Sequence, residues 1–519
     1  MKLNYKRTFL VGFAFFLISA FWQAYDATIP VILTNKFGMS QTWSGVIMAL
    51  DNILAVFMLP IFGALSDKCR SPKGKRTPFI TIGTIIAAVA LVCLSFVDSA
   101  QLRNVSDVAA IDDPAALAVI YDKQADATLQ TPEGEAFVLS EVMSKEDFTS
   151  ITSSITYLDG TEDANPMYAN YVAPARQACA ADATAQQPVF LILFVVLLLA
   201  VLIAMAVFRS PAVALMPDVT IKPLRSKANA IINLMGTAGG ILVLVLGMVF
   251  ATSAVKNSMM RYTLYYGIIA AIMLGALGIF KFTVKEPQWA EQMRKDSIRL
   301  GIDEAEPEDS GEKRRLTARK KRSLLLILAS IALWYIGYNA VTSKYSLYAS
   351  SVLGMDYNST LLLAQAAAII SYMPAGIVAS RIGRKKTILA GVVMLSFAFA
   401  LASFMRMGSS PALMNVLFAL AGIGWATINV NSFPMVVEMC SGADIGKYTG
   451  YYYTASMAAQ IITPIFSGYL MDLPNLGMTV LFPYAAIFVA LAFVTMSLVR
   501  HGDTKVEAKK GLEALNIDD

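Results

Sequence analysis

The hydrophobic and polar positions divide the chain into long apolar runs separated by polar segments. Six runs lie in the first part of the sequence, near residues 9–34, 42–65, 78–98, 188–216, 228–252 and 262–284. Six more follow, near residues 322–343, 358–380, 386–406, 411–437, 448–471 and 478–500. About 20 apolar helical residues, at 1.5 Å each, cross the roughly 30 Å hydrocarbon core of a bilayer. The pattern predicts an all-α membrane protein with twelve transmembrane helices.

The composition agrees with a membrane environment. Hydrophobic residues make up 56% of the 519 positions and charged residues 15%, whereas soluble domains carry roughly 25% charged residues. The net charge of +5 comes from Lys and Arg in short loops between apolar runs, which is typical of membrane topology and gives no reason to expect nucleic-acid binding. Four cysteines at scattered positions imply no disulfide framework.

The positive charges predict which side of the membrane the termini occupy. They cluster in segments that alternating helices place on one side, namely residues 68–76, 222–227, 313–315 and 381–386. Positively charged loops are retained in the cytoplasm, so both termini are expected there, with the protein in the cell membrane. The first apolar run continues without a small-residue cleavage site, so we interpret it as an uncleaved helix.

Two polar segments interrupt the helices and define the expected domains. We predict an N-terminal six-helix bundle over 1–284, a charged, solvated and mobile cytoplasmic linker over 285–321, a C-terminal six-helix bundle over 322–501, and a cytoplasmic tail over 502–519. Residues 100–187 form an insert between the third and fourth helices, on the outer side. The insert holds 14 acidic and 4 basic residues. Short helices are expected near 114–122 and 134–143, within a small cap or partly disordered loop. A glycan-capturing role is the alternative.

The two bundles carry a related motif. Gly63-Ala-Leu-Ser-Asp67-Lys68, followed by Gly74-Lys75-Arg76, matches Gly376-Ile-Val-Ala-Ser380-Arg381, followed by Gly383-Arg384-Lys385-Lys386, at an offset of 313 residues. Parallel six-helix repeats related by an axis along the membrane normal bind substrate near the midplane between them. The repeat therefore predicts two pseudo-symmetric bundles and alternating access.

Three separated segments carry a family resemblance. The segment from Gly63 to Ile80 resembles the loop between helices 2 and 3 of the major facilitator superfamily. Its Ser-Asp-Lys-Cys and Gly-Lys-Arg-Thr-Pro-Phe-Ile parts are similar to the sucrose-transporter branch of the glycoside-pentoside-hexuronide:cation symporters. Segments 209–218 with 225–230, and 422–434, agree with this branch in the same order. The resemblance covers the chain except the insert, and implies the major facilitator fold and a sugar symporter.

The basic loop after the second run is a candidate gate. Asp67, Lys68 and Arg76 are expected to latch helix ends, since a carboxylate near a helix N-terminus gains roughly 0.3–1 kcal/mol. For the basic residues, marking of topology is the alternative. Asp218 and Glu438 close helices on the same side, where Arg225 or Arg381 could pair with them, and ordinary capping of the helix ends is equally compatible.

Charged residues inside the apolar runs are the strongest functional candidates. Each costs at least roughly 2.5–3.5 kcal/mol at a helix centre on insertion scales. Asp26, within Trp22-Gln23-Ala24-Tyr25-Asp26, is expected to bind sugar or a proton, with an interfacial charge as the alternative. Asp51 is the second proton candidate. Arg209 resembles the family's intramembrane arginine, which implies coupling, and snorkelling to the interface is its alternative.

Neutral hydrogen-bonding and aromatic side chains complete the expected sugar site, because aromatic faces and polar groups recognise a polyol. Pairs four residues apart, such as Trp425 with Asn429, share a helix face. Glue between helices is the alternative role of each polar group. The substrate-binding candidates are Trp22, Gln23, Tyr25, Asp26, Tyr335, Tyr338, Asn339, Gln365, Trp425, Asn429, Asn431 and Gln460.

The expected function is proton-coupled uptake of a sugar, a di- or oligosaccharide such as an α-glucoside, by a monomer that is not an enzyme. Melibiose-type relatives place two sodium-binding carboxylates where Ala55 and Leu59 stand here, which favours H⁺ over Na⁺. No phosphate-binding loop or metal-spaced cluster occurs in the sequence, so no cofactor is expected. His501 lies at a helix end, away from any relay. An exporter of drugs or other small molecules, or a non-transporting sugar sensor, are the alternatives.

Overall fold

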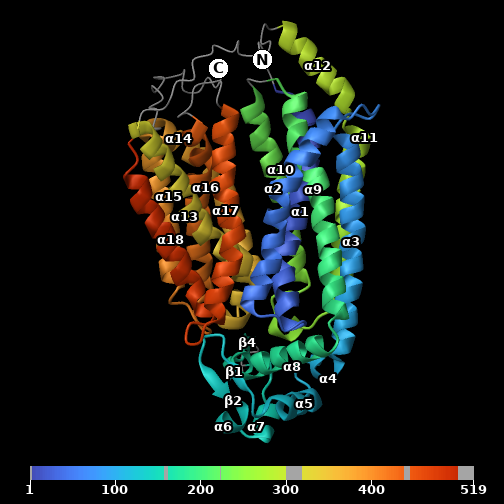
Figure 1. Cartoon of the computed structure of the whole chain (residues 1–519), viewed down its shortest axis with the longest axis vertical. Coiled ribbons are helices and arrows are strands. Elements are labelled where there is room, and N and C mark those ends of the chain that lie inside the picture. The colour runs from blue at the N-terminus through green and yellow to red at the C-terminus, as the bar shows by residue number, and fades with distance from the viewer. Residues whose placement is uncertain (1–2, 157–161, 222–223, 300–317, 438–444, 501–519) are drawn as a thin grey trace.

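The computed structural model describes residues 3–156, 162–221, 224–299, 318–437 and 445–500 (Figure 1). Two groups of six long helices stand side by side, and an insert of short elements covers one end. α1 begins and α18 ends at the opposite end (Figure 1). We call these the insert end and the termini end. The arrangement confirms the predicted all-α membrane architecture with two six-helix bundles.

The first six long helices form the N half. They are α1 (Tyr5–Asn35), α2 (Gln41–Lys68), α3 (Thr77–Asn104), α9 (Val189–Val219), α10 (Arg225–Val249) and α11 (Thr263–Thr283). Local chemistry sets several helix starts. Asn4 and Ser40 accept backbone N–H bonds at the starts of α1 and α2, and Pro78 lies in the first turn of α3, where no N–H partner is lost.

The last six long helices form the C half. They are α13 (Ala318–Tyr348), α14 (Tyr357–Ile382), α15 (Arg384–Ala402), α16 (Pro411–Val437), α17 (Ile445–Asp472) and α18 (Leu481–Ser497). The π-helical turn η4 (Ala349–Leu353) extends α13, and the 3-10 turn η6 (Met478–Val480) precedes α18. Gly383, with φ +95°, separates α14 from α15 in the repeated motif.

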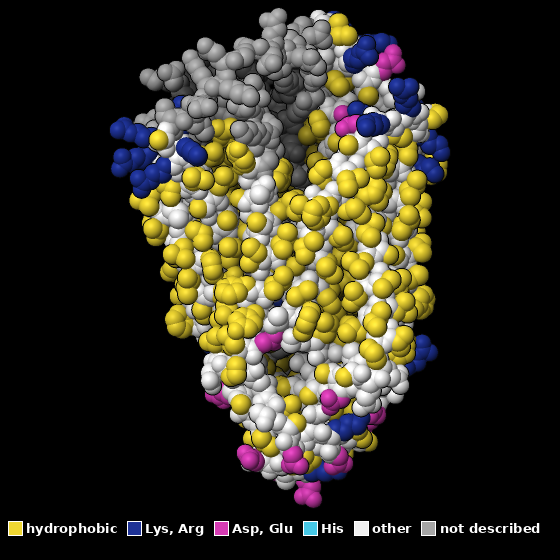
Figure 2. All heavy atoms as spheres, in the orientation of Figure 1, with side chains coloured by type: hydrophobic (Ala, Val, Ile, Leu, Met, Phe, Trp, Pro, Cys, Tyr) yellow, Lys and Arg dark blue, Asp and Glu magenta, His cyan; other side chains and the backbone are white. Residues whose placement is uncertain are grey.

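Eleven of the described helices are long and apolar enough to cross a membrane by length and composition. The twelfth, α17, carries Ser456, Gln460, Thr463 and Ser467 along its length. On the face shown in Figure 2, an apolar belt crosses both halves, with charged side chains above and below it. Each of the twelve predicted runs coincides with one of these helices. The largest shift is at the end of α3, which continues six residues beyond the predicted residue 98.

The insert is a folded cap. It contains α4 (Ser106–Ala109), α5 (Pro114–Gln124), α6 (Leu139–Val142), α7 (Lys145–Thr149), the π-helical turn η1 (Tyr168–Val172) and α8 (Ala173–Gln186). Antiparallel pairs join β1 (Thr128–Gln130) to β2 (Ala136–Val138), and β3 (Ser154–Thr156) to β4 (Glu162–Ala164). The helix predicted near 114–122 is confirmed as α5. The helix predicted over 134–143 is wrong in its first part, where β2 pairs with β1 and only Leu139–Val142 is helical.

The charged segment between the halves begins with a helix, α12 (Glu286–Arg299), rather than the mobile chain expected there. The acidic part of the predicted linker, residues 300–317, lies outside the described residues. A further 3-10 turn, η3 (Val255–Asn257), lies between α10 and α11.

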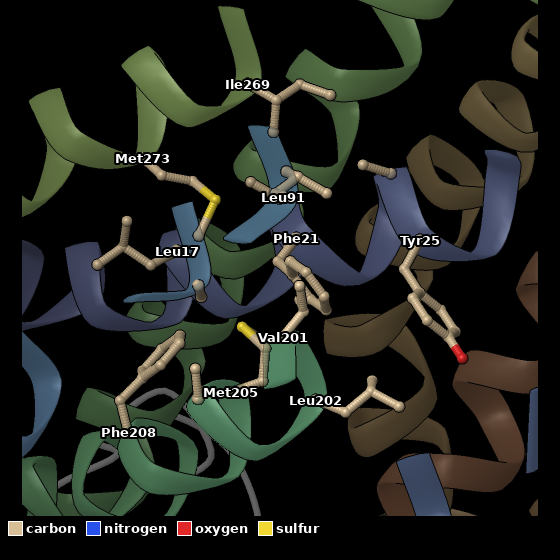
Figure 3. Packing of buried hydrophobic residues seen from close by; sticks show 14 of the residues in the cluster. Leu17, Phe21, Tyr25, Leu91, Val201, Leu202, Met205, Phe208, Ile269 and Met273 are labelled. Atoms are coloured by element: carbon tan, nitrogen blue, oxygen red, sulfur yellow. The ribbon is translucent and has the colours of Figure 1, made fainter. Parts of the chain in front are cut away.

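Each half has its own hydrophobic core. The N-half core includes Leu17, Phe21, Leu91, Met205 and Phe208, which converge from α1, α3 and α9 (Figure 3). A separate cluster fills the C half, with Trp334 and Phe482 among its buried members. Apart from Ala27 of α1, which packs into the C-half cluster, the two cores are separate, and this allows the halves to move as bodies relative to one another.

The halves touch at the insert end. A Cβ atom on Gly45 of α2 would lie 2.0 Å from the carbonyl oxygen of Pro464 in α17, and one on Gly468 would lie 2.2 Å from that of Gln41. Asp472 accepts the backbone N–H groups of Gln41 at 2.8 Å and of Thr42 at 2.7 Å. At the termini end, Figure 2 shows a hollow between the halves.

Candidate functional site

A cavity of about 180 Å³ lies between the two halves. Five long helices line it: α1, α2 and α9 from the N half, and α13 and α17 from the C half. The lining residues are Trp22, Tyr25, Asp26, Met48, Asp51, Asn52, Arg209, Asn339, Thr342, Ser343, Gln460 and Pro464.

The charged groups of this cavity all come from the N half. Asp26 lies on α1, Asp51 on α2 and Arg209 on α9. Asn52 donates its amide to Asp51 at 2.7 Å. Within the described part of the chain, none of the three charged groups makes an ion pair within 4 Å. Two carboxylates and a guanidinium therefore share one cavity without neutralising each other by direct contact.

The aromatic side chains of α1 form one wall. Trp22 and Tyr25 are 5.4 Å apart between ring centroids, edge to face, and the guanidinium of Arg209 lies 5.5 Å from the centre of Trp22. Tyr25 belongs to the N-half core, and Figure 3 shows its hydroxyl pointing away from the other labelled core residues, toward helices of the C half. Both Trp22 and Tyr25, predicted from the sequence, line the cavity.

The polar side chains that the C half contributes to the cavity are all neutral, and Pro464 adds an apolar surface. Asn339 and Gln460 were expected from the sequence, whereas Thr342 and Ser343, together with Asn52 on α2, were missed. Thr342 and Ser343 follow Asn339 by three and four residues, the spacing of one helix face, which was the available signal.

Three lining side chains carry buried hydrogen-bonding atoms that no group in the described part of the chain satisfies. They are the indole nitrogen of Trp22, the hydroxyl of Tyr25 and the amide nitrogen of Asn339. Buried polar atoms without a partner are uncommon, because each costs about 1–3 kcal/mol. Their convergence on one cavity indicates a site for a polar, hydrogen-bonding solute.

The other predicted binding residues lie outside the cavity lining. Gln365 on α14 donates to Gln23 on α1 at 2.5 Å, and this bond joins the two halves. Trp425 stacks on Tyr338 with centroids 3.7 Å apart and receives Tyr335 edge-on at 5.2 Å. These three aromatic side chains therefore pack against one another within the C half and do not line the cavity.

The two remaining binding candidates, both on α16, also lie outside the cavity lining. Asn431 is 2% exposed and donates to the Thr427 carbonyl of its own helix at 2.9 Å. The carbonyl of Asn429 accepts a hydrogen bond from the hydroxyl of Ser432. Asn431 has the environment of a residue that satisfies its own helix rather than one that meets a solute.

A polar network at the termini end joins three of the predicted gating residues. Arg76, 4% exposed, donates to Asp218 at 2.8 Å and pairs with Asp67, and Lys75 lies 3.3 Å from Asp218. Burial opposes the charge of Arg76, but the hydrogen bond and charge of Asp218, followed by those of Asp67, raise its pKa above the ordinary value. All members belong to the N half.

The same network contains a residue that sequence reasoning missed. Glu286, 2% exposed at the start of α12, accepts the backbone N–H groups of Arg76 and Thr77 at 2.8 Å each. A carboxylate in this position caps the N-terminus of α3. Gly74, with φ +108°, leaves room for it, since a Cβ there would lie 2.2 Å from a Glu286 carboxylate oxygen.

The other gating candidates lie outside this network. Among the described side chains, the partners of Asp218 are Arg76 and Lys75. Of its two predicted partners, Arg381 forms no ion pair with it, and the side chain of Arg225 lies outside the described residues. Lys68 ends α2 and Arg381 lies in the last turn of α14, and both are exposed. Glu438 lies outside the described residues.

Twelve long helices in two halves, eleven of them long and apolar enough to cross a membrane in the described part of the chain, with a charged cavity between the halves, are the architecture of an integral membrane transporter and not of an enzyme. The family model described as Major Facilitator Superfamily matches residues 173–372 and 358–516, and the model described as MFS/sugar transport protein matches residues 10–102. The chain belongs to the Major Facilitator Superfamily.

Curated relatives match only part of the chain. The MFS-type transporter ppzB of Metarhizium rileyi (strain RCEF 4871) is 25% identical over 152 residues, which are 29% of this chain and 30% of the relative. Sucrose transport protein SUC3 of Arabidopsis thaliana is 34% identical over 67 residues, 13% of this chain and 11% of the relative. The chain therefore matches less than a third of the length of these relatives.

Solved structures match along nearly the whole chain. The inward-open xylose transporter XylE from E. coli has a TM-score of 0.56 at 16% identity and covers 98% of both chains. A D-xylose-proton symporter has a TM-score of 0.55 at 14% identity and covers 95% of this chain and 97% of its own. At these identities the similarity shows the fold alone. Together with the sugar-transport family model, it supports a sugar transporter.

Proposed function

We propose that this protein takes up a sugar by proton-coupled symport and alternating access. The observation that carries the proposal is the division of the cavity between the halves: Asp26, Asp51 and Arg209 come from the N half, and neutral hydrogen-bonding groups come from the C half. A cavity formed in this way joins a titrating group to a polyol-binding surface. When one half moves against the other, the surroundings of the titrating group and of the polyol-binding surface change at the same time.

The substrate of the proposal is a neutral, hydroxyl-rich solute. Asn339, Thr342, Ser343 and Gln460 offer amides and hydroxyls, and Trp22 offers an aromatic face of the kind that packs against sugar rings. A di- or oligosaccharide such as an α-glucoside is the expected substrate class, as the partial match to a sucrose transport protein suggests. Because the cavity holds about 180 Å³ in this state, a longer sugar requires it to extend, so monosaccharides belong in the same test.

Asp26 or Asp51 carries the proton in this proposal. A lone carboxylate in a water-poor membrane interior is costly when charged and unpaired. Each carboxylate therefore favours either protonation or pairing with Arg209. Proton binding and release shift the balance between these two arrangements, and that shift couples the proton gradient to the conformational cycle.

The proposal places the termini end in the cytoplasm and the protein in the cell membrane. Lysines and arginines of the α2–α3 connection, and those of the adjoining ends of α14 and α15, lie at the termini end, and positive residues are retained in the cytoplasm. With the halves in contact at the insert end and a hollow at the termini end, the state described here opens to the cytoplasm. The Arg76 network forms the N-half side of the cytoplasmic gate.

The decisive experiment uses purified protein in liposomes. Sucrose, maltose, melibiose and glucose are offered in turn, with pH and sodium gradients imposed separately and the external pH recorded. The expected result is alkalinisation of the outside medium that one sugar triggers without sodium. Absence of both uptake and proton movement across the panel contradicts the proposal and favours an exporter. Saturable sugar binding without accumulation favours a non-transporting sensor.

A further inference from the structure

The insert is anchored in the N half. The amide of Gln177 on α8 donates to Asn35 at the end of α1 at 2.9 Å, and Gln101 of α3 donates to Thr184 of α8 at 3.0 Å. Gly38 lies against α8 so closely that a Cβ would be 2.3 Å from the Ala181 nitrogen. The insert has its own hydrophobic cluster, which includes Met259 from the loop between α10 and α11. It therefore moves with the N half.

The insert reaches the other half at Ala164 of β4, which lies beside Gly354, and, through backbone hydrogen bonds, at the β1–β2 hairpin. The hairpin tip, residues 131–135 between β1 and β2, lies against the C-half loop formed by residues 473–478. The backbone N–H of Asn475 donates to the Gly134 carbonyl at 2.8 Å, and that of Met478 donates to the Pro132 carbonyl at 2.7 Å. The Gln130 amide donates to the Leu473 carbonyl at 3.2 Å. These bonds extend across the boundary between the halves.

Two further features make the contact specific. Gly134 and Gly477 both have positive φ, +96° and +56°, and a Cβ on Gly477 would lie 2.4 Å from the Gly134 nitrogen. Glycine is the residue that permits such backbone geometry and such a close approach. Beside them, Arg406 in the α15–α16 connection pairs with Glu133 at 3.2 Å.

The loop that the hairpin tip contacts begins directly after Asp472. Asp472 accepts the N–H groups of Gln41 and Thr42, so a C-half carboxylate caps the first turn of N-half helix α2. Lys344 of α13 donates to the carbonyl of Gln41 at 2.9 Å and adds a buried contact at the same place. Fixing residues 473–478 therefore also fixes the residue that closes the gap between α2 and α17.

We propose that the β1–β2 hairpin is an extracytoplasmic latch that favours the state closed at the insert end. The inference rests on the alternating access of the proposed function, but on neither its sugar nor its proton. When the halves separate at the insert end, the tip must release Asn475, Met478 and Arg406, because the insert stays with the N half. The latch thus adds to the free energy of opening on that side and sets the ratio of the two end states.

The test measures hydrogen exchange of the full-length protein in liposomes without any sugar. In the main variant, residues 131–135 are replaced by Asn-Gly, a two-residue turn that keeps the pairing of Gln130 with Ala136. Amides of Asn475 and Met478 lose their acceptors directly, so the informative amides are Gln41 and Thr42, which the hairpin does not touch. We expect these two to exchange about tenfold faster, the combined effect of several hydrogen bonds and an ion pair.

Two further variants test whether the effect of the main variant comes from misfolding of the hairpin or from any change in the insert. Glu133→Arg faces Arg406 with a like charge and leaves the hairpin length intact, so a smaller increase at Gln41 and Thr42, about threefold, is expected. Lys145→Ala is the matched control, because it removes the Lys145–Asp122 pair, which lies within the insert and is similarly exposed. In this control, the amides of Gln41 and Thr42 should exchange at the same rate as in the unmodified protein.

Unchanged exchange at Gln41 and Thr42 in both hairpin variants overturns the latch, whatever happens at Asn475 and Met478. Sugar uptake by the same proteoliposomes reports separately on the proposed function. Transport without a latch effect removes only this inference, and a latch effect without sugar transport removes only the proposed substrate.

Discussion

At the residue scale, the cavity is lined by two kinds of polar side chain, charged and neutral. The charged residues Asp26, Asp51 and Arg209 were predictable, because a charge inside an apolar run has a high cost and therefore attracts attention in a sequence. Asn52, Thr342 and Ser343 were not, because neutral polar residues occur throughout membrane helices as glue between them. Only their position in space distinguishes them.

Substitution of the two carboxylates should separate proton coupling from sugar binding. We expect Asp26→Asn or Asp51→Asn, whichever removes the proton carrier, to reduce uphill accumulation about tenfold or more, since an amide cannot carry a proton at this site. Exchange of sugar across the membrane without a gradient should persist in that variant. The measurement is accumulation against counterflow in the same proteoliposomes. Full proton-driven accumulation in both variants would remove these residues from coupling.

Cys179 in α8 should react slowly with thiol reagents. Burial raises the pKa of its thiol to about 11, so less of the reactive thiolate is present at neutral pH than for an ordinary cysteine. A rise of about two units corresponds to about 100-fold slower labelling, before the steric effect of burial is added. Maleimide labelling followed by peptide mass spectrometry, with the partly exposed Cys69 as internal reference, checks this. Equal labelling of Cys179 and Cys69 would show that the rest of the insert does not bury Cys179.

At the element scale, long helices were predictable and short elements were not. A run of about 20 apolar residues has one interpretation in a chain of this composition, so α2, α9 and α16 were found within a few residues. Three-residue strands such as β1 and β2 are too short to show a period of hydrophobic and polar positions in the sequence. The stacking of Tyr338 on Trp425 was equally hidden, because helix spacing does not reveal the partner on another helix.

The junction of α12 with α3 gives a prediction at this scale. Glu286→Ala removes a buried carboxylate that caps α3, and we expect a loss of about 1–2 kcal/mol in the free energy of unfolding. The melting temperature in detergent should fall accordingly. Glu291→Ala, on the exposed face of the same helix, is the control and should leave the melting temperature unchanged. Equal melting temperatures for both variants would argue against the cap.

At the scale of the whole molecule, two bundles were predictable from the sequence, but the end of the molecule at which they are in contact was not. The motif at an offset of 313 residues and the alternation of loop charges indicate the halves and their orientation. The state of the molecule depends on small differences between contacts at the two ends. Residues such as Gln41, Asp472 and Lys344 take part in those contacts, and nothing in their sequence context identifies them.

Blocking the contact at the insert end should open the molecule there. Gly45→Ala places a Cβ 2.0 Å from the Pro464 carbonyl oxygen, so the state closed at the insert end should lose at least about tenfold in population. Spin labels at Arg103 and Ser410, which are exposed on opposite halves at that end, report the change as a longer distance. Gly267→Ala, where a Cβ meets nothing within 4 Å, is the control. A distance distribution identical to that of the control would contradict the role of this contact.

The glycines at the boundary of α2 and α17 also have a consequence for speed. Where bulky side chains interlock, separating two surfaces requires many rotamers to change together, and this raises an activation barrier. At Gly45 and Gly468 the surfaces are bare main chain, so they part and rejoin without such rearrangement. The frequency of reorientation is then governed by a small number of polar contacts nearby. A single substitution among them should alter turnover far more than the area of the boundary suggests.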